Sequence, residues 1–121
     1  YLREAMKAEG ARVLLATDDG SVGHKGFVTE ILSEELARLG ADSVGGVYTC
    51  GPEGMMHAVV KIARAAGVPG QASMERHMAC GYGVCFTCVM KLKQADGSLH
   101  NTRTCLQGPV IPFDRLPDAE W

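Results

Sequence analysis

The chain has 121 residues, of which 46% are hydrophobic and 21% are charged, so it has room for one ordinary domain or two small modules. Its 12 basic and 14 acidic residues give a formal net charge of −2, which argues against a nucleic-acid-binding surface. No apolar run approaches the roughly 18 residues of a membrane helix, and the charged residues among the first ten are unlike a signal peptide.

Residues 1–70 alternate helices with short apolar strands. The pattern predicts a helix over residues 1–8, a buried strand over 12–16, a helix over 27–39, a strand over 46–50 and a helix over 52–66. Gly40 and Gly67 follow the last two helices, where glycine commonly ends a helix in the left-handed conformation. Because strands that alternate with helices usually form parallel sheets, the sequence predicts part of a parallel, NAD-binding sheet over residues 1–70.

A different pattern begins after residue 70. Residues 89–93 alternate apolar and polar side chains, Asp96-Gly97 is a typical hairpin turn, and residues 98–104 are expected to form the returning strand. The predicted fold class is therefore α/β, with a partial NAD-binding domain over residues 1–70 and a small antiparallel β domain around a metal centre over residues 71–121.

Four of the five cysteines gather in the second predicted domain. The odd number of cysteines, without a secretory signal, argues against a disulfide framework and predicts a reduced, cytoplasmic chain. The spacing of the four is Cys80-x4-Cys85-x2-Cys88-x16-Cys105. A C-x4-C-x2-C run with a distant fourth cysteine is typical of plant-type [2Fe–2S] centres, so these four are the predicted ligands.

The loop between these cysteines is rich in glycine. Gly81 and Gly83 are expected to supply the positive φ angles that wrap a chain around a cluster and turn its N–H groups towards the sulfur atoms. The alternative is a zinc site with four cysteine ligands. Zinc modules usually contain two C-x2-C motifs, whereas this chain contains one, so the cysteine spacing favours the cluster.

A loop after the predicted strand 12–16 is one candidate for nucleotide binding. It contains Asp18, Asp19 and Gly20. Loops at the carboxyl ends of parallel strands bind ligands in α/β proteins. Carboxylates there can accept hydrogen bonds from ribose hydroxyls and would repel the 2′-phosphate of NADP, so NAD is the expected nucleotide. The alternative is a solvated turn, because Asp-Asp-Gly is common in turns.

A second candidate loop leads from the predicted strand 46–50 into the next helix. It consists of Cys50, Gly51, Pro52 and Glu53. Backbone N–H groups at a helix N-terminus could meet a pyrophosphate, and Cys50 would lie near whatever the sheet binds. The alternative for Cys50 is a small thiol packed in a tight turn.

These motifs resemble those of a known family. Residues 50–56, Cys-Gly-Pro-Glu-Gly-Met-Met, resemble the Cys-Gly-Pro motif that flanks the nicotinamide in the ferredoxin–NADP reductase superfamily. Residues 75–88 and 103–110 are similar to the electron-transfer subunit of NAD-linked dihydroorotate dehydrogenase. The resemblance covers almost the whole chain and implies a partial ferredoxin-reductase-type sheet followed by a small antiparallel β [2Fe–2S] module.

The resemblance also implies a function in electron relay. In that family, a partner subunit carrying FMN oxidises dihydroorotate to orotate in pyrimidine biosynthesis. Electrons pass singly through the [2Fe–2S] cluster to FAD, which gives a hydride to NAD⁺. The family's FAD-binding β-barrel does not appear in this sequence, and the chain opens without methionine inside a predicted helix. We therefore expect a C-terminal part of such a subunit, paired in the intact protein with the FMN subunit and NAD(H).

Two other functions stay open at this point. One is the related flavoprotein subunit of sulfide dehydrogenase or of an NADH-dependent ferredoxin–NADP reductase. The full set of four cysteines argues against this branch, where we expect one relative to replace a cysteine by aspartate. The other is a non-enzymatic interaction module that binds zinc or a cluster, which a visible spectrum would distinguish.

Overall fold

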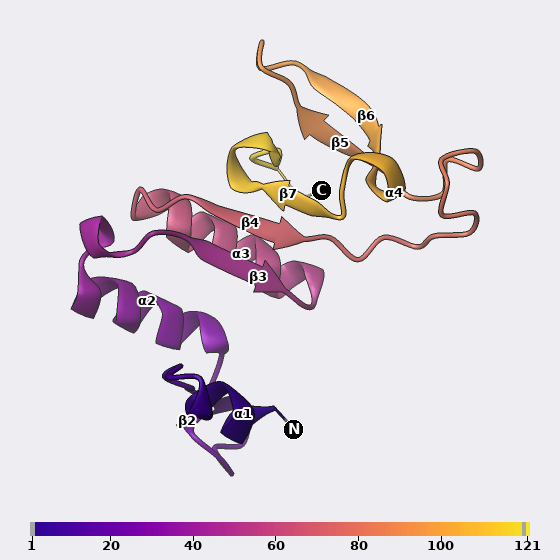
Figure 1. Cartoon of the computed structure of the whole chain (residues 1–121). Coiled ribbons are helices and arrows are strands. Elements are labelled where there is room, and N and C mark those ends of the chain that lie inside the picture. The colour runs from indigo at the N-terminus through magenta and orange to yellow at the C-terminus, as the bar shows by residue number, and fades with distance from the viewer. Residues whose placement is uncertain (1, 120) are drawn as a thin grey trace. The chain divides into compact units, whose positions relative to one another are not determined.

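The computed structural model describes residues 2–119 and residue 121 (Figure 1). The chain divides into a first unit that extends to Arg38 and a second unit that begins at Leu39. The fold is α/β, with both parallel and antiparallel strand pairs, which confirms the predicted class at this level.

The first unit contains α1 (Arg3–Ala8), β1 (Ala16–Thr17), β2 (His24–Lys25) and α2 (Val28–Leu39). Both predicted helices are confirmed, and Gly40 follows α2 with a φ of 78°. The predicted strand over residues 12–16 is largely wrong, because only Ala16 and Thr17 pair, in parallel with the unpredicted β2. An extended segment becomes a strand only where a neighbour takes up its backbone hydrogen bonds.

The second unit is built on a three-stranded sheet. After the short 3-10 helix η1 (Ala41–Ser43) come β3 (Val47–Cys50), α3 (Glu53–Ala65) and β4 (Gly70–Ser73), and β7 (Val110–Pro112) completes the sheet. The strand order is β3-β4-β7, with β3 and β4 parallel and β7 antiparallel to β4. The helix α3 packs against β3 and β4 and forms the crossover between these parallel strands. The sequence instead predicted one parallel sheet containing strands 12–16 and 46–50, but β1 pairs with β2 and β3 pairs with β4.

The rest of the second unit is a hairpin with short flanking helices. The strands β5 (Val89–Lys93) and β6 (Leu99–Arg103) pair antiparallel around the predicted Asp96-Gly97 turn. The helix α4 (Thr104–Gln107) follows β6 directly, and the 3-10 helix η2 (Phe113–Arg115) follows β7. The hairpin is confirmed, whereas β4, α4 and β7 are not part of the prediction.

The core of the second unit draws on both sides of residue 70. Its largest fully buried side chains belong to α3, β5, β7, the N-terminus of α4 and the segment after η2: Met56, Val60, Leu92, Thr104, Ile111 and Leu116. The sheet likewise takes β3 from residues 1–70 and β7 from residues 71–121. The division into domains at residue 70 stays a prediction beside this shared sheet and core.

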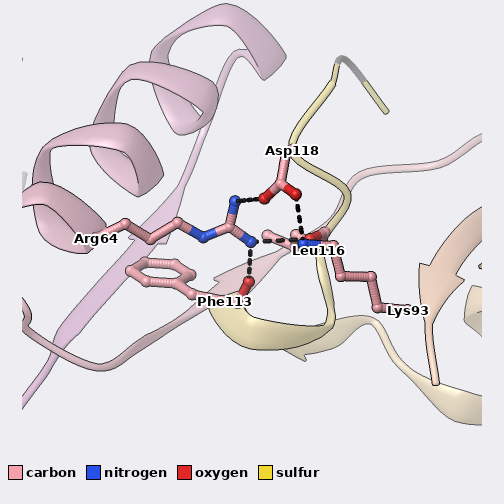
Figure 2. Close-up of polar contacts among 5 residues, drawn as sticks. All are labelled: Arg64, Lys93, Phe113, Leu116 and Asp118. Atoms are coloured by element: carbon pink, nitrogen blue, oxygen red, sulfur yellow. Dashed lines mark hydrogen bonds and ion pairs between the residues drawn. The ribbon is translucent and has the colours of Figure 1, made fainter. Parts of the chain in front are cut away.

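Arg64 on α3 holds the C-terminal segment in place, as Figure 2 shows. Its guanidinium donates hydrogen bonds to the carbonyl oxygens of Phe113 and Leu116, and its Nη1 lies 3.0 Å from Asp118 Oδ1. Lys93 Nζ, at the end of β5, donates to Asp118 Oδ2 at 2.7 Å. The hydrogen bond and charge of Lys93, with the charge of Arg64, hold the pKa of Asp118 below its ordinary value.

Replacing Arg64 by methionine should destabilise the second unit. The change keeps most of the aliphatic stem but removes the Arg64 donor from the Leu116 carbonyl oxygen and one of two donors from the Phe113 carbonyl oxygen. We expect a cost of about 1–3 kcal/mol in the free energy of unfolding. Urea denaturation followed by circular dichroism measures this cost. The matched control is Lys61→Met on the exposed side of the same helix, expected to change stability by less than about 0.5 kcal/mol. Equal effects of the two variants would contradict the role of Arg64.

None of the helices in the described residues is both long and apolar enough to cross a bilayer.

Candidate metal centre

The loop from Cys80 to Cys88 wraps around the first cysteine. Gly81 and Gly83 have φ angles of 74° and 89°, which confirms the predicted left-handed turns. These turns point the backbone N–H groups of Val84 and Cys85 at Cys80 Sγ, with N···S distances of 3.4 and 3.5 Å. The loop therefore presents hydrogen-bond donors to sulfur, as expected for a site that stabilises negative charge.

The four predicted ligands lie in two pairs. Cys80 and Cys85 are hydrogen-bonded neighbours in the loop. Cys88, which ends the loop, and Cys105 on α4 form the second pair. The pKa of Cys105 is raised mainly by its hydrogen bond with the Cys88 side chain and by burial, and a charge on Cys80 contributes to a smaller extent. The fold thus brings together thiols that are separated by up to 25 positions in the sequence.

Backbone hydrogen bonds favour the thiolate form in the loop. They lower the pKa of Cys80 to about 6, with the N–H group of Cys85 as the main cause. The pKa of Cys85 is lowered mainly by the Thr87 hydroxyl, which donates to its Sγ at 3.1 Å. A hydrogen bond from the backbone of Cys105 lowers the pKa of Cys88. Because thiolates are the form that binds metal, this loop is prepared to act as a ligand.

The fourth cysteine is brought to the loop by contacts on either side of it. Thr104, which is fully buried, donates two hydrogen bonds to the carbonyl oxygen of Cys88, from its N–H at 3.2 Å and its hydroxyl at 3.1 Å. On the other side of Cys105, the Leu106 side chain packs so closely on Gly83 that a Cβ there would lie 2.5 Å from Leu106 Cδ1. The φ angle of 89° favours glycine at position 83, and a Cβ there would also displace the Leu106 side chain.

The arrangement of the four cysteine thiols distinguishes between two kinds of metal centre. Among the described residues, no three side chains of histidine, cysteine, aspartate or glutamate converge on a position for a single metal ion. A single zinc ion needs all four ligands in one tetrahedron. A [2Fe–2S] cluster spreads four thiolates over two irons, so two pairs of cysteines suit it. The thiols and their N–H donors fit the cluster.

The predicted nucleotide residues lie in different units. In the first unit, Asp18 and Asp19 are exposed, and Asp19 Oδ1 accepts a hydrogen bond from the Ser21 N–H at 2.9 Å. This bond is the main reason why the pKa of Asp19 is lowered. Gly20 has a φ of 75°. The carboxylate thus stabilises its own turn, and binding of NAD by this loop stays a prediction.

In the second unit, Cys50 is exposed at the end of β3, and Gly51 turns the chain with a φ of 147°. Pro52 is the N-cap of α3, and Glu53 is the first helical residue, so the helix begins one residue later than predicted. Arg76 Nη2, in the segment that leads to the cysteine loop, donates to Glu53 Oε1 at 3.4 Å. This contact connects the start of α3 with the metal centre.

Residues 75–117 match the model of a protein family described as the iron–sulfur cluster binding domain of dihydroorotate dehydrogenase B. Over these residues the chain is similar to this iron–sulfur domain. The match contains all four paired cysteines, which agrees with the donor set described above.

Relatives named as electron transfer subunits of dihydroorotate dehydrogenase B (NAD⁺) are similar over most of the chain. The protein from Desulforamulus reducens is 39% identical over 84% of this chain, and that from Clostridium perfringens is 42% identical over 92%. A probable subunit from Methanocaldococcus jannaschii is 43% identical over 88%. The chain spans 37%, 40% and 37% of the lengths of these three relatives.

A solved structure of the NADH-dependent reduced ferredoxin–NADP oxidoreductase has a similar fold. It superposes with a TM-score of 0.65 at 26% identity, and the match covers 93% of this chain and 37% of that one. The neighbour is a ferredoxin–NADP reductase-type protein, as expected from the Cys-Gly-Pro motif.

Sequence reasoning missed several residues that organise the site. It did not assign a role to Thr104 or Leu106, and it did not foresee that Phe86, a non-glycine residue, has a φ of 60°. Phe86 and Thr104 adjoin predicted ligands, and this adjacency is the signal that the sequence offered.

Proposed function

We propose that this chain is the cluster-holding part of the electron-transfer subunit of an NAD-linked dihydroorotate dehydrogenase. The observation that carries the proposal is the arrangement of Cys80 with Cys85 and of Cys88 with Cys105, on a loop whose N–H groups point at sulfur. The family match over residues 75–117 and the names of the relatives support it.

In this proposal each pair of cysteines holds one iron of a [2Fe–2S] cluster. When bound, such a cluster supplies one-electron transfer at a potential that depends on charge, hydrogen bonds to sulfur and exposure to solvent. The N–H groups of Val84 and Cys85 and the Thr87 hydroxyl donate to the sulfur ligands and so stabilise their negative charge. The chain thereby controls how readily an electron is accepted.

The intact protein is proposed to work with two further cofactors and a partner. NAD(H) would meet the Cys50–Glu53 loop, and FAD, bound outside this chain, would convert single electrons into a hydride. An FMN-containing catalytic subunit would oxidise dihydroorotate, in a cytoplasmic complex. The fold match to the NADH-dependent ferredoxin–NADP oxidoreductase is compatible with that alternative. Its identity of 26% is lower than the 39–43% of the dihydroorotate dehydrogenase relatives, and this chain keeps all four cysteines, so the dihydroorotate branch is favoured.

Spectroscopy of the purified protein tests the proposal. A [2Fe–2S] protein is brown, has charge-transfer absorbance in the visible range, and gives an EPR signal after reduction by dithionite. Iron and acid-labile sulfide should be present in equal amounts. A colourless protein that contains zinc would contradict the proposal and favour the interaction-module alternative.

The surface around the cysteine loop is the proposed docking face for the catalytic subunit. Its large apolar side chains are about half or more exposed: Met78, Tyr82, Val84, Phe86 and Leu106. Electron transfer requires a short path between cofactors, and an exposed apolar surface with few charges is typical of the centre of an interface.

Tyr82→Asp should therefore weaken assembly with the catalytic subunit. Tyr82 is 70% exposed, so the change should leave the fold intact while placing a charge in the interface. We expect the dissociation constant to rise at least about tenfold, the equivalent of 1.4 kcal/mol. Titration calorimetry with the full-length protein measures it. The control is Leu99→Asp, at the end of the hairpin away from the cysteines, which should bind normally. Normal binding by Tyr82→Asp would place the interface elsewhere.

A further inference from the structure

Arg103 joins three parts of the metal centre. It ends β6, two residues before Cys105, and lies opposite Val89 in the hairpin. Its Nη1 donates to the carbonyl oxygen of Gly83 at 2.5 Å, and its guanidinium carbon lies 4.8 Å from the centre of the Phe86 ring. One side chain thus connects the hairpin with the turn at Gly83 and with Phe86, which follows Cys85.

Phe86 needs such a partner because its backbone is strained. A bulky residue with a φ of 60° is uncommon, and such conformations cost of the order of 1–3 kcal/mol unless the surrounding structure holds them. The Phe86 ring is 61% exposed, so burial does little to hold it. The stack with the guanidinium and the hydrogen bond to Gly83 join this part of the loop to β6. They act beside the hydrogen bond that the Val89 N–H, at the start of β5, donates to the Phe86 carbonyl oxygen at 3.3 Å.

In the part of the chain that the structure describes, no carboxylate forms an ion pair with Arg103. Of the cations near the ligands in sequence, Arg76 is paired with Glu53, and Lys91 is exposed on β5. Arg103 is half-buried and forms no ion pair with any residue that the structure describes. A half-buried charge is screened less by salt and water than an exposed one, so it acts more strongly on a neighbouring anion.

We propose that Arg103 is a positioning residue with two effects, which rests on the proposed cluster. Its guanidinium locks the cysteine loop in the conformation that receives the cluster. Its charge favours the reduced state, because uptake of one electron changes the total charge of the cluster and its four thiolates from −2 to −3. Arg103 does not touch the substrate and takes no part in proton transfer.

Two substitutions in the full-length protein separate these effects. Arg103→Gln removes the charge and the stack, whereas Arg103→Lys keeps the charge but loses the planar guanidinium. A redox titration with dithionite, followed by EPR, measures the midpoint potential. Limited proteolysis of the iron-free protein measures how firmly the loop is held. Lys91→Gln is the matched control, because it removes a charge from the exposed side of the same hairpin.

For Arg103→Gln we expect the one-electron equilibrium to shift about tenfold towards the oxidised state, which corresponds to about 59 mV. Arg103→Lys should stay nearer to the wild-type potential, and Lys91→Gln should not shift it. Both Arg103 variants should be cleaved faster in the loop than wild type, whereas Lys91→Gln should not.

An unchanged midpoint potential in Arg103→Gln would contradict the charge effect. Cleavage of both Arg103 variants at the wild-type rate would contradict the positioning of the loop. If Arg103→Gln fails to fold, Arg103→Lys still decides the positioning role. A wild-type protein without a cluster would instead contradict the proposed function, and cleavage of the iron-free loop would still test the role of Arg103.

Discussion

Replacing Cys88 by serine should abolish the iron–sulfur centre. Cys88 is only 3% exposed, and its carbonyl oxygen is held by two hydrogen bonds from Thr104. Its backbone is therefore held in place, and its thiol lies beside Cys105. A serine hydroxyl is a harder and far less acidic ligand than a thiol, whereas iron–sulfur clusters select soft thiolates.

Iron and sulfide analysis, visible absorbance and EPR of the dithionite-reduced protein measure the loss. All three signals should fall to background in Cys88→Ser. Cys50→Ser is the matched control, since Cys50 is exposed at the end of β3 and lies outside the cysteine loop. It should keep the full iron content and, in the full-length protein, slow the exchange between NADH and flavin. An unchanged EPR signal in Cys88→Ser, or loss of iron in Cys50→Ser, would show that the ligand assignment is wrong.

Ile111→Ala should cause the largest loss of stability among the substitutions considered. Ile111 on β7 is 0% exposed and lies opposite Ala72 of β4, which is also fully buried. Removing three buried carbon atoms from such a position leaves a cavity, and substitutions of this kind cost about 2–5 kcal/mol. Urea denaturation measures the change in the free energy of unfolding.

The neighbouring Val110 provides the control. It lies on the same strand but is 50% exposed, so Val110→Ala should cost less than about 1 kcal/mol. We also expect Ile111→Ala to unfold β3 and the β5–β6 hairpin in one transition, because β7 closes a sheet that begins with β3. Two separate transitions would instead support independent domains on either side of residue 70.

The features that the sequence predicted correctly depend on neighbouring residues. The helices α2 and α3 follow from an apolar stripe and a terminal glycine, and the hairpin follows from alternation around Asp96-Gly97. The turns of the cysteine loop are also determined locally, because Gly81 and Gly83 allow backbone angles that other residues rarely adopt. In each case the chain within a few positions determines the conformation.

The features that only the tertiary structure decided depend on residues far apart in the sequence. The strands β4 and β7 have four and three residues, too few for a recognisable period, and they exist because each finds hydrogen-bond partners across the sheet. The segment 12–15 has an apolar composition typical of a strand, yet the paired strand begins only at Ala16. Within the segment, the Leu15 carbonyl oxygen accepts a hydrogen bond from the His24 N–H at 2.8 Å.

The same distinction applies to the metal centre. The prediction of four cysteine ligands came from their spacing, because a loop that wraps a cluster needs short, fixed intervals between its thiols. The spacing could not show that Cys88 lies beside Cys105, or that Arg103 and Leu106 hold Gly83 from both sides of that cysteine. These contacts join positions 17 to 23 residues apart, and only the folding of β6 and α4 against the loop brings them together.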